Sequence, residues 1–342
     1  MKEADIITLA HGHGGRAMND LIKNIFLPAF GHKELAKMGD AALLEIPQAS
    51  LAVSTDSFVV NPLFFPGGDI GKLAVAGTVN DLAVSGATPL YLTAGFIMEE
   101  GCLLTTVAKI ARSMAREALE AGIAIVAGDT KVVERGKGDG VFINTTGVGS
   151  LEFGPVVGYE KIQPGDSILI NGDMGLHGMA VLSRRHGIEL ESGITSDCAS
   201  LNGLIRQVLA GCREEVKFMR DPTRGGAAAA LTEIAAASGL DILLDERLLP
   251  IPAEVKGYCD FLGLDPLYLA NEGKVLLVID PAAREKALRT LRSHPLGTDS
   301  CEIGQVKEKS LPKGEGRVLL KTLYGGTREI ADDGGLQLPR IC

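Results

Sequence analysis

A stretch rich in proline and glycine, residues 154–165, most constrains how this chain can fold. Pro155, Gly158, Pro164 and Gly165 all fall within it, and such residues mark turns and loops. Segments patterned for both helices and strands lie on either side. We therefore predict two α+β domains, over residues 1–155 and 156–324, followed by a mobile tail over residues 325–342. Two domains also suit a chain of 342 residues, because single cores stop growing at about 250–300 residues.

Hydrophobic periodicity predicts a mixture of helices and strands without strict βαβ alternation. Helices are expected after the first glycine-rich loop and at 70–84, 105–121, from 177, and at 200–212, 227–238 and 282–294. Strands are expected at 41–46, 51–55, 90–98, 123–126, 141–148, 167–171, 242–245, 274–280, 302–306 and 317–321. The order indicates an α+β fold.

Charge and cysteine usage exclude several classes of protein. The formal net charge is −9 with acids and bases interspersed, which argues against nucleic-acid binding. The longest uncharged run, 82–98, is interrupted by Ser85, Gly86 and Pro89, which argues against a membrane span. The six cysteines form no CxxC pair, so we expect neither a zinc site nor a disulfide framework. The first ten residues have no apolar h-region, so we expect no signal peptide and a cytoplasmic location.

Three acids stand next to predicted turns. Asp56 ends a strand, Asp81 follows Asn80, and Asp129 follows a strand in Gly128-Asp129-Thr130. Carboxylates from separate elements can hold magnesium against the phosphates of a nucleotide. The alternative, helix caps and turn formers, is open for each acid alone.

Paired glycines precede predicted helices at Gly14-Gly15, Gly67-Gly68 and Gly225-Gly226. Glycine lets phosphate oxygens approach backbone N–H groups at a helix N-terminus. The segments match neither a Walker A nor a dinucleotide fingerprint, and ordinary turn geometry is the alternative explanation.

The last residue of the sequence, Cys342, is a third signal. It cannot belong to a prenylation box, which requires three residues after the cysteine. From Gly335, the chain could extend about 23–25 Å, enough to carry a thiol into a cleft. An inert thiol on a frayed end is the alternative.

Together these segments resemble the HypE family of hydrogenase maturation factors over essentially the whole chain. The segments that carry the resemblance are Ala10-His11-Gly12 with Gly14-Gly15, Ser54-Thr55-Asp56-Ser57, Asn61-Pro62-Leu63-Phe64-Phe65-Pro66-Gly67-Gly68-Asp69-Ile70-Gly71, Asn80-Asp81-Leu82-Ala83, Gly128-Asp129-Thr130, Asp221-Pro222-Thr223-Arg224-Gly225-Gly226, Asn271-Glu272-Gly273 and Pro339-Arg340-Ile341-Cys342. The acidic and glycine segments are similar to those of the wider PurM-like superfamily of aminoimidazole ribonucleotide synthetase, whereas the terminal segment selects HypE. His13 departs from the pattern, where a small residue is expected.

The resemblance implies a PurM-like fold whose N-terminal mixed sheet pairs with a second copy into a barrel-like homodimer core, with a C-terminal α/β sandwich domain. It implies ATP in the cleft between the domains, with Mg²⁺ on Asp56, Asp81 and Asp129. The residues expected around the nucleotide are these three acids with Gly14, Gly15, Asn80, Thr130, His177, Arg224 and Gly225.

The implied activity is that of a carbamoyl dehydratase. A HypF-type carbamoyltransferase would load a carbamoyl group on Cys342, and ATP-dependent dehydration would leave a thiocyanate. A HypC–HypD iron scaffold would then receive the cyanide for nickel–iron hydrogenase. We expect Glu272 as the base and Lys131 as a cation for phosphoryl transfer, with Gly325-Gly326 and Gly334-Gly335 as hinges of the tail.

Two other functions stay open at this stage. The chain could be an ATP-dependent synthetase or kinase of the same superfamily that acts on a free small molecule, with Cys342 dispensable. It could also be a non-catalytic carrier that presents a thiol to its partners.

Overall fold

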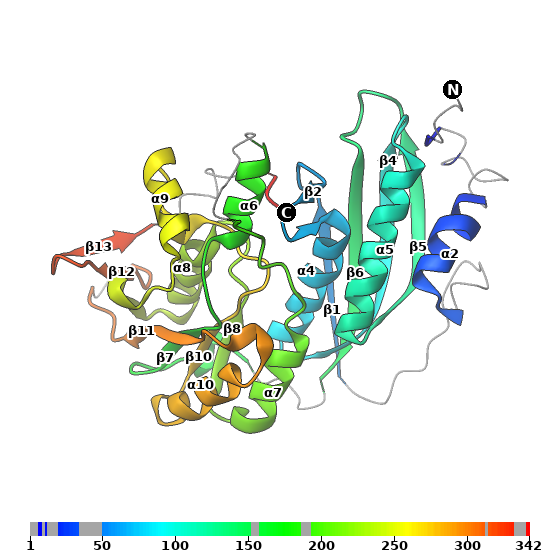
Figure 1. The fold of residues 1–342 in the computed structure, drawn as a ribbon. Coiled ribbons are helices and arrows are strands. Elements are labelled where there is room, and N and C mark those ends of the chain that lie inside the picture. Colours follow the sequence, from blue (N-terminus) through cyan, green and yellow to red (C-terminus); the bar gives the residue numbers. More distant parts are fainter. Residues whose placement is uncertain are drawn as a thin grey trace.

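The computed structural model describes residues 6–8, 11, 20–33, 50–151, 157–185, 193–311, 314–331 and 340–342. Within them the chain forms two large sheets, each with its own helices, that lie side by side (Figure 1). The predicted strand at 41–46 and the residues Gly14, Gly15 and His13 lie outside the described part.

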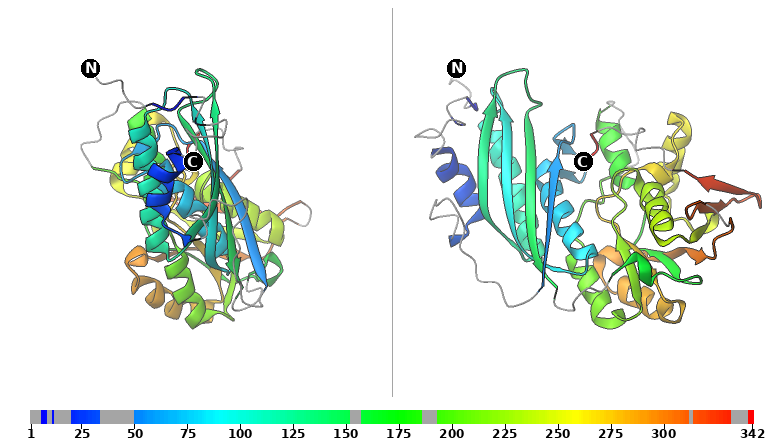
Figure 2. Two further views of the ribbon diagram at one scale, coloured as in Figure 1. Left: turned by 90° about the vertical axis from the view of Figure 1, so that its right-hand side faces the viewer. Right: turned by 180° about the vertical axis from the view of Figure 1, so that it is seen from behind.

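The first sheet is mixed and has the strand order β1-β6-β4-β5. Its strands are β1 (Leu51–Phe58), β4 (Thr88–Glu99), β5 (Ala124–Val133) and β6 (Val141–Ser150). Strands β4 and β5 are parallel, and the other pairs are antiparallel. Helices α4 (Ile70–Val84) and α5 (Leu104–Ala121) cover one face, with η2 (Ile22–Phe26) and α2 (Leu27–Phe30) beside α5. No described helix covers the other face (Figure 2).

Helix α4 is apolar along almost its whole length, because it lies between the first sheet and α7. It begins at Asp69, whose Oδ1 accepts hydrogen bonds from the backbone N–H groups of Gly71 (2.8 Å) and Lys72 (3.1 Å). These N–H groups have no partner inside the helix, so the carboxylate caps it. A short hairpin of β2 (Phe64–Phe65) and β3 (Gly68–Asp69) leads into this cap.

The second sheet has the order β13-β12-β9-β11-β7-β10-β8. Its strands are β7 (Ser167–Ile170), β8 (Val216–Arg220), β9 (Asp241–Asp245), β10 (Leu276–Ile279), β11 (Cys301–Lys307), β12 (Val318–Lys321) and β13 (Thr327–Ile330). Strand β7 is buried on both faces: Ile168 packs in the core with α8 (Gly226–Ser238), and Leu169 packs with α7 (Asn202–Cys212) and α10 (Arg284–Arg292). This is the sandwich expected for the C-terminal part.

The remaining elements connect this sandwich. They are α6 (Leu176–Arg185), α9 (Ala253–Leu262) and the short 3₁₀ helices η3 (Tyr159–Lys161), η4 (Glu246–Leu248), η5 (Pro266–Tyr268), η6 (Pro281–Ala283) and η7 (Pro295–Gly297).

Most of the predicted elements are confirmed, and α4 has the predicted bounds. The sequence analysis missed β8, α9 and β13. It placed Thr327–Ile330 in a mobile tail, whereas these residues pair with β12. Gly325 has φ 85° in the turn of this hairpin, where Thr322 N–H donates to the Gly326 carbonyl at 2.8 Å. This pair of glycines therefore forms a turn between strands, and the second proposed hinge lies outside the described residues.

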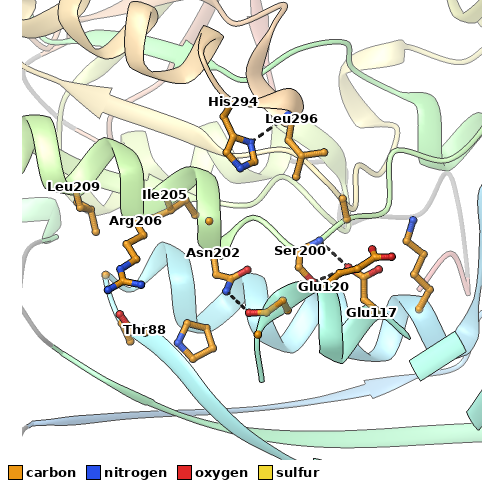
Figure 3. A pocket seen from close by; sticks show the side chains of 18 residues that line it. Thr88, Glu117, Glu120, Ser200, Asn202, Ile205, Arg206, Leu209, His294 and Leu296 are labelled. Atoms are coloured by element: carbon orange, nitrogen blue, oxygen red, sulfur yellow. Dashed lines mark hydrogen bonds between the residues drawn. The ribbon is translucent and has the colours of Figure 1, made fainter. Parts of the chain in front are cut away.

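Side-chain hydrogen bonds join the two halves of the molecule. Glu117 on α5 accepts from Ser200 N–H (3.0 Å) and Oγ–H (2.7 Å), and Asn202 on α7 donates to the Ala121 carbonyl (2.8 Å). These bonds lie along a pocket of about 610 Å³ between α5, α7 and η7 (Figure 3). They fix the segment after residue 198 against α4 and α5.

Loss of the α4 cap provides a test of the fold. We expect Asp69→Ala to lower the free energy of unfolding by about 1–2 kcal/mol, because two backbone donors lose their acceptor. Asp69→Asn keeps an acceptor and serves as the control. Urea denaturation followed by circular dichroism measures both, and equal stability of the two variants would contradict the capping role.

Candidate active site

The end of the chain, residues 340–342, lies beside the segment between β1 and β2. Val59 N–H donates to the Cys342 carbonyl (3.1 Å), and Asn61 N–H donates to the Arg340 carbonyl (3.4 Å). The Arg340 side chain returns a bond from Nε to the Val59 carbonyl (3.0 Å). The tail is thus paired through its main chain with the N-terminal half, near β2 and α6 (Figure 1).

Helix α6 forms the opposite wall of the tail site. Nε2 of His177 lies 2.9 Å from the Ile341 carbonyl oxygen, and Nη2 of Arg185 donates to the Arg340 carbonyl at 2.7 Å. Arg185 also donates to the Asn61 carbonyl. The Ile341 side chain is only 3% exposed and belongs to the core cluster of the first half. The tail is therefore docked between both halves of the molecule.

The docked tail carries Cys342 into an acidic cleft. Burial raises the pKa of its thiol, and the nearby carboxylates of Glu272, Asp56 and Asp221 raise it further, while Arg224 acts in the opposite direction. Four separate segments supply these groups. Because the thiolate is the nucleophilic form of cysteine, the docked side chain is a protonated, weakly reactive thiol.

Three asparagine side chains hold the loop that carries Glu272. Asn80 on α4 donates to the Glu272 carbonyl (3.4 Å), and Asn171 after β7 donates to the carbonyl of the next residue (3.1 Å). Asn271 donates to the carbonyl of Pro222 (3.0 Å), in the loop before α8. The Glu272 side chain is 2% exposed, and its Oε1 has no hydrogen-bond partner among the described residues. One buried carboxyl oxygen is thus available to a ligand.

The backbone beside this loop is packed too closely for a side chain at residue 273. A Cβ on Gly273 would lie 1.9 Å from the Asp197 carbonyl oxygen. Oδ1 of Asp197 accepts from Glu272 N–H (3.2 Å), and its Oδ2 lies 3.4 Å from Nζ of Lys274. The two charged side chains of this pair are 3% and 11% exposed, so a buried ion pair stands directly behind the loop.

Burial and mutual repulsion raise the pKa values of the acids in the cleft. Burial is the main cause for Glu272, whose pKa is raised well above its ordinary value, with further contributions from four aspartates. Burial also raises the pKa of Asp221 to about 7, aided by Asp81 and Asp56. The pKa of Asp56 is raised by burial and by Asp81. Without a cation, the protonated forms of these carboxyl groups are therefore favoured more than they would be in water.

The structure brings together Asp56 and Asp81 but not Asp129. Asp56 faces α4, whereas the register of the sheet aligns Asp129 with Ser57, on the opposite face. Asp129 is 68% exposed there and pairs with Lys131 at 2.8 Å, which lowers its pKa. In the described part of the chain, no three His, Cys, Asp or Glu side chains converge as ligands for a metal.

The other predicted contacts have mixed surroundings. Thr130 is 5% exposed on the α4 side of its strand. Gly225 is the N-cap of α8 and adopts φ 71°. The positive charge of Arg224 lowers the pKa of Asp56. Both ring nitrogens of His177 are bonded within the protein while the tail is docked. Contacts of these residues with phosphate stay predictions.

Sequence reasoning missed several residues of the site. Asp221 stands in a segment quoted for its arginine and glycines, and its burial depends on the loop of Asn271. Arg185 binds a main-chain oxygen of the tail, and Ser196 binds the ring of His177, which in turn contacts the tail. Sequence spacing gives no signal for such contacts. Asp197 contacts Glu272 only because residues 196–199 run beside 271–273.

The chain is similar to known proteins over almost its whole length. Two family models match the chain: AIR synthase related protein, N-terminal domain, over residues 38–151, and the C-terminal domain of the same family over residues 163–315. A carbamoyl dehydratase HypE of Cupriavidus necator is 48% identical over 98% of this chain and 95% of its own. The chain belongs to the HypE family of carbamoyl dehydratases, which are enzymes with a PurM-like fold.

Solved structures show the same fold. A crystal structure of hydrogenase maturation protein HypE in complex with ATP superposes with a TM-score of 0.93 at 44% identity, covering 98% of this chain and 99% of that one. A chain from a crystal structure of a HypE–HypF complex superposes with a TM-score of 0.79 at 48% identity, covering 91% and 99%. In the described part of this HypE-family chain, no helix is both long and apolar enough to cross a membrane.

The raised pKa of Asp221 predicts how stability depends on pH. Its pKa is about 7 in the folded protein against an ordinary value of 3.8. Between these values the folded state holds a proton that the unfolded state releases, so this group destabilises the fold as pH rises towards 7. Asp221→Asn removes the effect. We expect the variant to gain stability relative to the parent, on the order of a few kcal/mol, between pH 4.5 and about pH 8.

Urea unfolding of both proteins at several pH values, without nucleotide or magnesium, measures this difference. A difference in the free energy of unfolding between the two proteins that does not change with pH would show that Asp221 is not protonated in the cleft.

Proposed function

We propose that this chain dehydrates an S-carbamoyl group on Cys342 to a thiocyanate, with ATP as co-substrate, to supply cyanide for nickel–iron hydrogenase maturation. The observation that carries the proposal is the docked tail, which delivers Cys342 to the buried carboxyl of Glu272. A free-standing small molecule would not need such a tail.

The chemistry needs a leaving group and a base. The carbonyl oxygen of a thiocarbamate leaves poorly, so transfer of the γ-phosphoryl group of ATP to this oxygen makes it a phosphate ester. Forming this ester releases one N–H proton to solvent and leaves a C=N–H group. Glu272 then takes the one remaining N–H proton as the C–O bond breaks and phosphate departs. Nitrogen and carbon form the triple bond, and the products are S–C≡N, ADP and phosphate. We assign the base to Glu272 because its Oε1 is buried and has no partner among the described residues.

Support for ATP comes from a HypE relative that was crystallised with it. Asp56 and Asp81 suit the Mg²⁺ that accompanies ATP, because the repulsion between Asp56 and Asp81 is relieved by a cation. Magnesium in phosphate sites is usually held by one or two carboxylates, with phosphate oxygens and waters completing its coordination. Ser54 Oγ–H donates to Asp81 (2.7 Å) and orients this carboxylate. When bound, the ion would supply positive charge for phosphoryl transfer.

Arg224 is our candidate for the second positive charge. Its positive charge acts on both Asp56 and Cys342, so it lies close to one of the proposed magnesium ligands and to the thiol. Lys131 and Asp129 pair with each other on the face of the sheet opposite to Asp56. The catalytic role of Lys131 and the metal-binding role of Asp129 therefore have no support from this geometry and stay predictions.

Carbamoyl transfer requires the tail to leave this cleft. The docked thiol holds its proton because burial and carboxylates raise its pKa, whereas a thiol in water ionises more readily. A HypF-type carbamoyltransferase is the proposed donor, and a relative was crystallised in a HypE–HypF complex. Delivery of cyanide to a HypC–HypD iron scaffold would again need an undocked tail.

The bare face of the first sheet supports a homodimer. Val53 is 67% exposed and Leu51 is 47% exposed on this face, and Ile97 is 45% exposed in the same sheet. Exposed apolar side chains on an uncovered sheet face favour association. A second copy of the chain would cover them.

The activity is tested by mass spectrometry of the C-terminal peptide after incubation with magnesium, ATP, carbamoyl phosphate and a HypF-type partner. We expect addition of a carbamoyl group at Cys342, followed by ATP-dependent loss of one water. Cys342→Ala should give neither change. Glu272→Gln should be carbamoylated but should lose water at least about a hundredfold more slowly, because general-base catalysis contributes about 10²–10⁴-fold.

Cys301→Ser is the matched control, since this half-buried cysteine lies on β11, away from the docked tail. An unmodified Cys342 in a mixture that consumes ATP on a free small molecule would favour the synthetase or kinase reading.

The dimer is tested by light scattering after size-exclusion chromatography. We expect Val53→Glu to shift the protein from dimer to monomer, because it places charge in an apolar contact. Leu119→Glu changes an equally exposed apolar residue (80%) on α5 and should leave the dimer intact. A dimeric Val53→Glu variant would remove this face from consideration.

A further inference from the structure

Two side chains of α6 hold consecutive carbonyl groups of the docked tail. His177, in the first turn of the helix, contacts the Ile341 carbonyl, and Arg185, at its last residue, contacts the Arg340 carbonyl. The helix therefore spans the docked segment with one contact at each end. The proposed function assigns no chemical step to either residue.

The hydrogen bonds of His177 form a directed chain. The Ile341 carbonyl can only accept, so Nε2 of the neutral ring carries the proton. Nδ1 must then accept from Ser196 Oγ–H at 2.8 Å, and the same oxygen accepts from Cys198 N–H at 3.0 Å. Phe65 packs edge-on against the ring at 5.2 Å. The imidazole is fully buried with the tail in place, and Ser196 and Phe65 hold its orientation through contacts that do not involve the tail.

Arg185 joins the tail to the other wall of its site. Its guanidinium donates to the Asn61 carbonyl from Nε (2.9 Å) and Nη2 (2.8 Å) and to the Arg340 carbonyl from Nη2. It therefore bridges the segment after β1 and the tail that pairs with this segment. A planar guanidinium is well suited to two acceptors at once.

We propose that His177 and Arg185 are positioning residues, which hold the tail by its main chain so that the sulfur of Cys342 stays in the cleft whatever group it carries. The hydrogen bonds that both residues make to the tail go to backbone oxygens. A thiol, a thiocarbamate and a thiocyanate would therefore be docked by the same bonds. The effect on dehydration rests on the proposed function, whereas the effect on docking does not.

The direct test measures how often the tail undocks. Cys342 of the full-length protein is alkylated with iodoacetamide, and its modification is followed in the C-terminal peptide released by a glutamate-specific protease. The docked thiol is half-buried and its raised pKa keeps it protonated, so reagent reacts mainly with the undocked state and the rate reports the undocked fraction. We expect Arg185→Ala to raise this rate about tenfold, because bonds to charged groups are worth about that factor in an equilibrium.

Arg184→Ala is the matched control, because the neighbouring arginine of α6 is exposed and should leave the rate unchanged. His177→Ala should raise the rate about fivefold, and His177→Gln should restore slow alkylation, since its amide can still donate to the Ile341 carbonyl. Should His177→Ala fail to fold, Arg185→Ala and Arg184→Ala decide the matter. Equal alkylation of these two arginine variants would overturn the proposal.

The two half-reactions separate positioning from general damage. In Arg185→Ala we expect carbamoylation of Cys342 to proceed as fast as in the parent or faster. ATP-dependent loss of water should slow about tenfold, because the sulfur is less accurately placed even while the tail is docked. A merely destabilised protein would slow in both steps, and this result would overturn the positioning role. If alkylation rises as expected but no water is lost even in the parent, the docking role stands and the proposed function fails.

Discussion

Main-chain hydrogen bonds of three residues determine where one sulfur atom lies. The segment after β1 pairs with residues 340–342, and α6 closes over them from the other half of the molecule. The acids of the cleft act on the Cys342 thiol only while the tail is docked. The site thus requires both halves of the molecule to be correctly placed, and Asn80, Glu117 and Asn202 hold them together.

The cleft is electrostatically unfavourable until a cation enters. Asp56 and Asp221 repel nearby acids, and Glu272 is buried with an oxygen that no described residue satisfies. Such arrangements cost stability and are typical of functional sites. Arg224 compensates only partly. In the proposed function, magnesium with ATP would relieve the repulsion, so that binding and catalysis would be coupled through the same carboxylates.

The sequence was sufficient for elements with strong local signals. Helix α4 was predictable because a largely apolar run follows Asp69, with Lys72, Asn80 and Asp81 as its strongly polar members. Helix α9 was missed because only Val255 and Cys259 on it are buried. Asp56 lies close enough to Asp81 for the second carboxylate to raise its pKa, and the role of both acids in holding magnesium stays a prediction. Asp129 points to the opposite face of the sheet from Asp56. This depends on strand register, because a shift of one residue would move its side chain to the other face, and the sequence pattern does not fix the register to that precision. His177 was expected at phosphate, yet its partners come from residues 196 and 341, which only the tertiary fold brings together.

The close approach of Gly273 to the Asp197 carbonyl limits how this site can evolve. Any side chain there would collide with backbone, which cannot rotate away as a side chain can. A descendant could therefore change this position only by moving residues 196–199 as well, and with them Ser196 and the support of the tail. Divergence at the position after Glu272 would thus mark a lineage in which the docking of the tail had been rebuilt or abandoned.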